Sequence, residues 1–213
     1  MKIKFLSSVL VSILLLALQG FVYSQQLEAT TTVTGGISTL YANDPLGQSL
    51  CFKDGKYGSV FEGGQVRNRC SHLNFNSYSK NGFRAGVQGG EKGIILDLGS
   101  PQELQEKYKY GETVGFGQGF AALGIKNGKA FILKDHQAKT VQAVEGSEVL
   151  YQDSGDLIES APVNLGHVYL VRVFDPQVKN TDILAKVIVI SYIPDQFVTF
   201  RWQLLVDEKT IEK

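Results

Sequence analysis

The chain has 213 residues, of which 43% are hydrophobic, and its 21 basic and 21 acidic side chains give a formal net charge of zero. This balance argues against the concentrated basic surface that nucleic-acid-binding proteins use, so we expect no nucleic-acid partner. A length of about 200 residues predicts a single domain that folds without a metal or a framework of cysteines.

Residues 1–24 are typical of a secretory signal peptide. Lys2 and Lys4 form a basic start, and the apolar run Leu6–Leu18 is too short to span a membrane. Small residues precede the expected cleavage site before Gln25. Cleavage there leaves about 189 residues, with 19 basic and 21 acidic side chains. We therefore expect an exported protein, in the periplasm, at the cell surface or outside the cell, with no stable membrane insertion.

The chain has two cysteines, Cys51 and Cys70. Because exported proteins meet an oxidising environment, we predict a disulfide between them. The bridge closes a loop of about 20 residues, which is worth about 3 kcal/mol in the chain-entropy estimate. Two free structural cysteines, or a Cys70 nucleophile activated by Arg69 or His72, are the alternatives. The disulfide is the favoured interpretation.

The first part of the mature chain reads as short strands separated by turns. Residues 25–36 are rich in threonine and end in two glycines, which predicts an extended lead-in or a first edge strand. A β-rich domain then covers residues 37–206, and residues 207–213 form a polar tail. Frequent turn signals separate short apolar segments such as Phe83–Val87 and Ile94–Leu98.

A single short helix is predicted over about residues 101–110. Ser100 suits the N-cap, Pro101 the first helical position, and Glu103 completes a capping box. An apolar pair four residues apart then shares one face of the helix. Gly111 supplies the stop signal.

The second half of the chain contains the clearest strand signals. Asn127-Gly128 between two apolar segments predicts a hairpin, because a type I′ turn needs positive φ at both positions. Three long strands follow, joined by connections too short for parallel crossovers, so we expect antiparallel pairing. They are His167–Phe174, Ile183–Ile193 and Gln196–Val206. Trp202 alternates with other apolar residues in the last strand, which predicts a core position rather than a platform for sugars.

These signals together predict a mainly β protein. We expect an antiparallel β-sandwich or barrel-like domain with one short α-helix at about 101–110. The predicted hairpin and the three last strands supply its main sheet.

A polar, glycine-rich stretch over residues 66–120 carries the candidate binding residues. Two arginines and a histidine lie beside the expected disulfide and suit an anion or a sugar. Two glutamates and a glutamine further along the stretch add hydrogen-bonding groups. The predicted ligand-binding residues are Arg67, Arg69, His72, Glu91, Glu112 and Gln118. A disulfide and tight turns would hold them on a stiff base. The alternative is that the arginines form surface ion pairs and His72 caps a turn.

Motifs for catalysis or cofactors are absent from the sequence. No cysteine, histidine or carboxylate pattern has metal-ligand spacing, and neither a nucleophile elbow nor a dinucleotide fingerprint occurs, so we expect no metal and no cofactor. Four acidic residues are candidates for a glycosidase carboxylate pair: Glu91, Asp97, Glu103 and Glu112. However, Glu103 is explained by helix capping, and Asp97 lies between leucines of a predicted strand.

We therefore expect a secreted, non-catalytic binding or surface module, with a glycan or another envelope component as its partner. Two alternatives stay open. One is an extracellular hydrolase that uses a carboxylate pair, and the other is a structural or assembly protein that pairs through an exposed strand edge. The sequence sets neither the ligand nor the oligomeric state.

Overall fold

The computed structural model describes much of the chain beyond the expected signal peptide. The described residues are 34–45, 47–58, 61–62, 65–66, 70–77, 79–87, 91–109, 120, 123–126, 128–133, 141–177 and 182–205. The expected signal peptide, residues 25–33 of the lead-in and the polar tail lie outside them. Within the described ranges, no helix is both long enough and apolar enough to cross a membrane.

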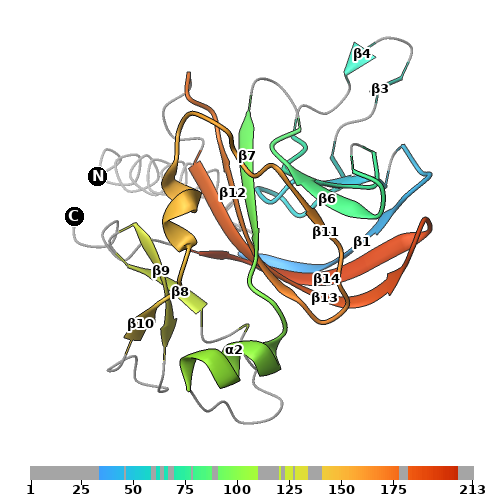
Figure 1. Ribbon diagram of the computed structural model, residues 1–213. Coiled ribbons are helices and arrows are strands. Elements are labelled where there is room, and N and C mark those ends of the chain that lie inside the picture. The colour runs from blue at the N-terminus through green and yellow to red at the C-terminus, as the bar shows by residue number, and fades with distance from the viewer. Residues whose placement is uncertain are drawn as a thin grey trace, which may run out of the picture. The chain divides into compact units, whose positions relative to one another are not determined.

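The largest sheet has five antiparallel strands in the order β1-β14-β13-β12-β7 (Figure 1). Their bounds are β1 (Gly35–Tyr41), β14 (Phe197–Leu205), β13 (Asp182–Ile193), β12 (Val168–Phe174) and β7 (Lys92–Asp97). The antiparallel pairing of β12, β13 and β14 confirms the prediction for the last third of the chain. β1 begins at Gly35, so the last two residues of the expected lead-in belong to the first strand.

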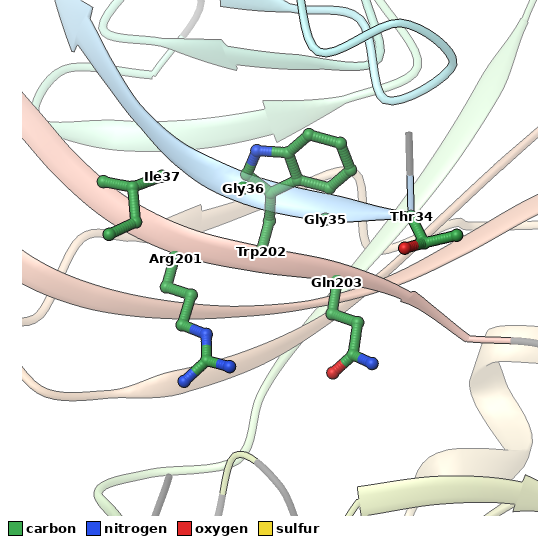
Figure 2. A pocket seen from close by; sticks show the side chains of 7 residues that line it. All are labelled: Thr34, Gly35, Gly36, Ile37, Arg201, Trp202 and Gln203. Carbon is green, nitrogen blue, oxygen red and sulfur yellow. The ribbon is translucent and has the colours of Figure 1, made fainter. Parts of the chain in front are cut away.

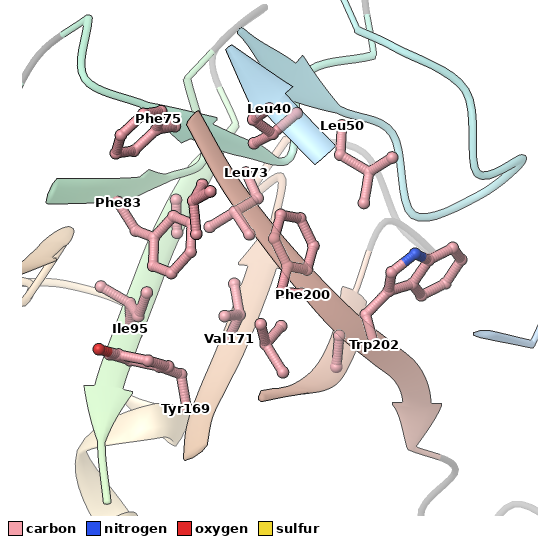
Figure 3. Packing of buried hydrophobic residues seen from close by; sticks show 14 of the residues in the cluster. Leu40, Leu50, Leu73, Phe75, Phe83, Ile95, Tyr169, Val171, Phe200 and Trp202 are labelled. Atoms are coloured by element: carbon pink, nitrogen blue, oxygen red, sulfur yellow. The ribbon is translucent and has the colours of Figure 1, made fainter. Parts of the chain in front are cut away.

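A second antiparallel sheet packs against one face of the first. Its strands, in spatial order, are β11 (Ser160–Pro162), β6 (Gly82–Ala85), β5 (Leu73–Phe75) and β2 (Ser49–Leu50). Between the sheets, the Phe83 ring meets the rings of Tyr169 at 5.5 Å and Phe200 at 5.7 Å, both edge to face (Figure 3). Trp202 is 1% exposed within this core, as predicted. The structure confirms the predicted mainly β, sandwich-type fold.

The other face of the central strands is covered as well. An α-helix, α2 (Pro101–Tyr108), a 3₁₀ helix, η1 (Ser147–Tyr151), and a small sheet form a second apolar cluster with it. The small sheet has the strands β10 (Val141–Ala143), β9 (Lys129–Leu133) and β8 (Leu123–Lys126). With both faces covered, every residue of β12 is buried. A short hairpin joins β3 (Phe61–Glu62) and β4 (Gln65–Val66).

The helix α2 begins as predicted. The Glu103 backbone N–H donates to Ser100 Oγ at 3.2 Å, and the Ser100 backbone N–H donates to the Glu103 carboxylate at 2.7 Å. The hydrogen bond from the Ser100 backbone N–H, followed by the contribution of the Ser100 side chain, lowers the pKa of Glu103. The helix ends at Tyr108, and Lys109, with φ 52°, occupies the left-handed position that the sequence assigned to Gly111.

The predicted hairpin between β8 and β9 is present, with Lys126 opposite Lys129. It pairs with β10 in the small sheet, so the prediction that it belongs to the main sheet with the last three strands is wrong. Gly128 has a φ of 69°, a conformation that glycine adopts without steric cost. Asn127 lies outside the described residues.

A buried arginine ties η1 to the large sheet. Arg172 in β12 donates two hydrogen bonds to Asp182, at 2.9 and 2.7 Å, and one to the buried Leu150 carbonyl at 2.9 Å. Asp153 lies 3.1 Å from the same guanidinium, which stacks 4.3 Å from the centre of the Phe174 ring. Burial alone would lower the pKa of Arg172, but the hydrogen bonds and charge of the two aspartates raise it.

Candidate functional site

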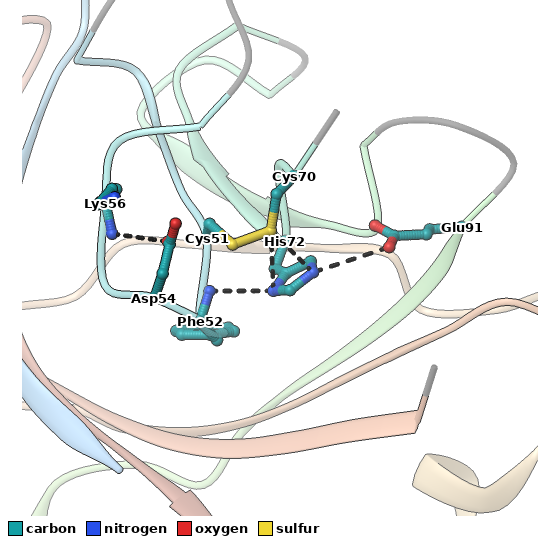
Figure 4. The surroundings of a disulfide bond; sticks show 7 residues. All are labelled: Cys51, Phe52, Asp54, Lys56, Cys70, His72 and Glu91. Carbon is teal, nitrogen blue, oxygen red and sulfur yellow. Dashed lines mark hydrogen bonds and ion pairs between the residues drawn. A yellow bond between two sulfur atoms is a disulfide. The ribbon is translucent and has the colours of Figure 1, made fainter. Parts of the chain in front are cut away.

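The Cys51–Cys70 disulfide forms as predicted. Cys51 follows β2 and Cys70 precedes β5, and because these two strands pair, their ends bring the Cα atoms to 5.2 Å. The bridge therefore fastens the base of the segment between the two cysteines. We call the bridge and the polar groups around it, His72 and Glu91, the staple site (Figure 4).

His72 is fully buried at the staple site, and its tautomer follows from its contacts. The Phe52 backbone N–H donates to His72 Nδ1 at 3.0 Å, so Nδ1 carries a lone pair and the proton sits on Nε2. Nε2 lies 3.3 Å from Cys70 Sγ and 3.7 Å from Glu91 Oε1. The imidazole therefore joins the loop after Cys51 to the disulfide and to Glu91.

Glu91 has one buried carboxylate oxygen, Oε2, with no hydrogen-bond partner among the described residues. An orphaned buried acceptor costs stability, so this carboxylate is not explained by packing alone. Of the six predicted ligand-binding residues, the structure brings His72 and Glu91 together. The other four, Arg67, Arg69, Glu112 and Gln118, lie outside the described residues, so the predicted constellation stays a prediction.

The ligand atoms of Cys51, Cys70 and His72 lie within 4.8 Å of one another, a spacing that would suit a metal ion. In the disulfide form, however, neither sulfur is a thiolate, which is the form that binds metals. His72 Nδ1 already accepts a backbone hydrogen bond, and Nε2 carries the proton. The oxidised staple site is therefore a structural support and does not offer a metal-ligand set.

Aromatic rings connect the staple site to the large sheet. The His72 ring lies 5.9 Å from that of Phe52, and Phe52 lies 5.4 Å from Trp202 in β14. The Trp202 indole N–H donates to Ser38 Oγ in β1 at 3.1 Å. The disulfide and His72 thus support the pair of strands β1 and β14 from the core side.

On the opposite face of β1 and β14 lies a hollow of about 350 Å³ (Figure 2). It is lined by Thr34, Gly35, Gly36, Ile37, Arg201, Trp202 and Gln203, and we call it the β1 hollow. Gly35 pairs with Gln203 and Ile37 with Arg201, so these four residues share one face of the sheet. A side chain at Gly35 would clash with β14, because an added Cβ would lie 2.7 Å from the Trp202 carbonyl oxygen. The glycine therefore lets the two strands approach closely and leaves bare backbone beside the hollow. The Trp202 ring points the other way, into the core.

Arg201, the charged residue of the β1 hollow, stacks on the buried ring of Phe120. The Arg201 guanidinium lies 4.9 Å from the centre of the Phe120 ring, and the Lys186 ammonium lies 4.9 Å from the same ring. Lys186 Nζ also donates to the Leu123 carbonyl at 3.2 Å. Stacking on an aromatic face restricts a guanidinium and leaves its N–H groups free to point outward.

A second polar cluster was missed by the sequence analysis. His167 Nδ1 lies 2.9 and 3.0 Å from the two carboxylate oxygens of Asp97, although 70 residues separate them. The pairing of β7 with β12 brings the two residues together, and no local pattern reports such a contact. A histidine oriented by a carboxylate can transfer protons, but among the described residues no hydroxyl or thiol makes a hydrogen bond to His167. The described residues therefore supply the histidine and its carboxylate but no nucleophile beside them.

Further hydrogen bonds give the Asp97–His167 pair a structural role. The Gly99 backbone N–H donates to Asp97 at 2.9 Å, and the Asn164 side-chain amide donates to it at 3.2 Å. The Asn164 backbone N–H also donates to the Tyr169 hydroxyl at 2.9 Å. Burial raises the pKa of Tyr169 well above its ordinary value, so this phenol stays protonated. The cluster anchors the turn before β12 to the end of β7.

Comparison with protein-family models, with curated proteins and with solved structures returned no match. The case for function therefore depends on the geometry of the staple site and the β1 hollow.

Proposed function

We propose that this protein is an exported, non-catalytic binding module that holds a glycan or another envelope component in the β1 hollow. The observation that carries the proposal is the composition of the hollow: an oriented guanidinium, an amide and a hydroxyl beside bare glycine backbone. Its volume of about 350 Å³ lies at the small end of ligand sites, which suits one ring-sized polar group.

The chemistry of the lining favours a ligand rich in oxygen atoms. Arg201 presents planar N–H donors that match a carboxylate or neighbouring hydroxyls, and the Gln203 amide both donates and accepts. Ile37 adds an apolar edge, 67% exposed, against which the carbon face of a sugar can pack. We therefore expect an acidic oligosaccharide to bind better than a neutral one.

Rigidity of the base supports binding. β14 is paired on both sides, with β1 and β13, and Trp202 beneath it rests on Phe52 and, through it, on the disulfide. A preorganised site loses less entropy when a ligand binds. The disulfide also supports export, because such bridges persist in oxidising compartments.

A glycan array that contains both uronic-acid and neutral oligosaccharides, followed by titration calorimetry, tests the proposal. Arg201→Ala should weaken binding at least about tenfold, since a hydrogen bond to a charged group is worth about 1.5–3 kcal/mol. The matched control is Arg84→Ala on β6, where the arginine pairs with Glu159 at 2.6 Å and lies outside the hollow. No binding by the wild type, or equal affinity of the wild type and Arg201→Ala, would contradict the proposal.

The hydrolase and the assembly protein stay predictions from the sequence. The hydrolase needs two carboxyl groups about 5 to 10 Å apart, and Glu112, one of its two expected residues, lies outside the described residues. Activity on an extracellular polymer that is lost in both Glu91→Gln and Glu112→Gln would favour it over the binding module.

A further inference from the structure

The two edges of the large sheet differ in how their backbone groups are used. At the β7 edge, the Ile95 N–H donates outward to the Ile158 carbonyl at 2.8 Å, so a neighbouring segment covers part of that strand. β1 forms the other edge, and Figure 1 shows it beside β14. An edge strand without a covering segment can pair with another chain.

The direction of the β1 backbone groups follows from its register. Just beyond the two ends of β1, Leu204 N–H donates to the Thr34 carbonyl and Ala42 N–H donates to the Gln196 carbonyl, each at 2.8 Å. Because hydrogen-bonded positions alternate along an antiparallel pair, the even-numbered residues of β1 bond to β14 and the odd-numbered ones face outward. The described residues offer no partner to the outward backbone groups of Gly35, Ile37 and Thr39.

β1 also lacks the features that normally protect an edge. The strand Gly35–Tyr41 contains no charged residue and no proline, and its register with β14 runs without a bulge. Monomeric proteins commonly block such an edge with lysine, proline or a bulge. Instead, Ile37 at its centre is 67% exposed. At the end of the strand, the Tyr41 N–H donates to the Gly47 carbonyl at 2.9 Å, so the loop after β1 covers that position. From Gly35 to Thr39 the edge is regular and uncharged, and no described residue covers its outward backbone groups.

We propose that β1 pairs antiparallel with β1 of a second copy of this chain, around a two-fold axis at Ile37. In this register Ile37 faces Ile37 of the second copy, and Gly35 faces the second copy's Thr39. Each pair of outward residues exchanges two bonds, so about six backbone hydrogen bonds form. The two exposed isoleucines cover each other, and the two five-stranded sheets become continuous.

The chemistry of the strand favours a second copy over an unrelated partner. Because β1 carries no charge, two copies of it can lie side by side without repulsion between their own side chains, as a two-fold contact requires. Arg201 pairs with Ile37, so in the dimer the two Arg201 positions stand three strand spacings apart, about 14 Å. This exceeds the screening length of about 8 Å at physiological salt, so their repulsion is weak. A contact one strand wide is small, and we expect a concentration-dependent dimer. Ile37 also lines the β1 hollow, so the dimer and a bound ligand would share this side chain, but the dimer needs no ligand to form.

Two single-cysteine variants test the register. The native cysteines are bonded to each other, so an added cysteine is the reactive thiol. In the proposed dimer the two residues at position 37 have Cα atoms about 5.5 Å apart, within reach of a disulfide. Mild oxidation, or a short bifunctional thiol reagent, should therefore cross-link Ile37→Cys. Thr39→Cys is the matched control. Its copies lie four residues apart along the strand, about 13 Å, so this variant should not cross-link.

Light scattering across a concentration series tests the association itself. The wild type should approach twice the monomer mass, and Ile37→Lys should stay monomeric. The control Ile190→Lys, at an isoleucine 49% exposed on β13 and away from the edge, should still form dimers. Equal thermal midpoints would show that both variants fold like the wild type. A monomeric wild type, dimers of Ile37→Lys, or cross-linking of Thr39→Cys in place of Ile37→Cys would each overturn the proposal.

Discussion

Replacement of Arg172 by alanine is expected to cause one of the largest losses of stability that a single substitution can produce in this protein. Arg172 is buried in β12 and holds η1 through the Leu150 carbonyl and the 182–193 strand through Asp182. The substitution removes a charge, several hydrogen bonds and the packing of a guanidinium on the Phe174 ring. The free energy of unfolding should fall by about 3–5 kcal/mol, the sum of an orphaned buried carbonyl and lost packing.

The partners of Arg172 show where this loss arises. The side chains of Asp182 and Asp153 are 57% and 72% exposed, so water solvates them after the substitution and each pair contributes at most about 1 kcal/mol. Water cannot replace the guanidinium at the Leu150 carbonyl, because Leu150 is fully buried. A buried carbonyl without a hydrogen-bond donor costs about 1–3 kcal/mol. The rest is lost packing, since alanine leaves space beside the Phe174 ring.

Urea unfolding followed by tryptophan fluorescence measures these losses, because Trp202 is the single tryptophan and lies in the core. Arg172→Met keeps most of the packing but still orphans the Leu150 carbonyl, so it should lose about 1–3 kcal/mol. Asp182→Asn should lose about 1 kcal/mol or less. Equal losses for Arg172→Ala and Asp182→Asn would refute the reasoning, because the exposed ion pair would then carry the stability.

Three further predictions concern the staple and the backbone. Reduction of the disulfide should lower the free energy of unfolding by about 3 kcal/mol, and an unchanged urea midpoint in reductant would contradict this. Hydrogen bonds from Ser100 lower the pKa of Glu103, so the stability that Glu103 adds is present above its ordinary pKa of 4.5 and is lost as pH falls through the lowered value. Thermal midpoints of the wild type and Glu103→Gln should therefore differ at neutral pH and converge in acid. A difference between the two midpoints that stays the same at every pH would contradict this contribution of Glu103. Gly86→Ala should lose about 3 kcal/mol or more in urea unfolding, because its Cβ would lie 2.3 Å from the Gly93 nitrogen. The control Gly166→Ala, also at positive φ but with open space around it, should lose only about 1 kcal/mol, and equal losses would show that crowding at Gly86 is unimportant.

Local signals in the sequence predicted the elements well. The capping box at Ser100 and the alternation around Trp202 need only neighbouring residues, and both are present as expected. The disulfide followed from the expected compartment and the number of cysteines. The end of α2 differed, because Lys109 entered the left-handed conformation before Gly111 was reached.

The candidate site could be predicted only in part. The sequence predicts His72 and Glu91 as ligand-binding residues, and the structure places them together at the staple site, with His72 buried beneath the sheet that carries the hollow. The hollow itself depends on Gly35 standing beside Gln203, a pairing between residues at opposite ends of the chain. The Asp97–His167 contact depends in the same way on the register of two strands.

The sequence by itself determined the class of the protein: short strands, one capped helix and a pair of cysteines that form a bridge. These properties arise from side-chain periodicity and local backbone preferences, which act over a few residues. Tertiary structure decided which faces are buried, which edge stays open and which polar groups meet. Strand pairing sets those contacts, and a register shift of one residue would turn Arg201 and Gln203 into the core and Trp202 outward. The edge position of β1 and the hollow beside it are therefore properties of the assembled sheet.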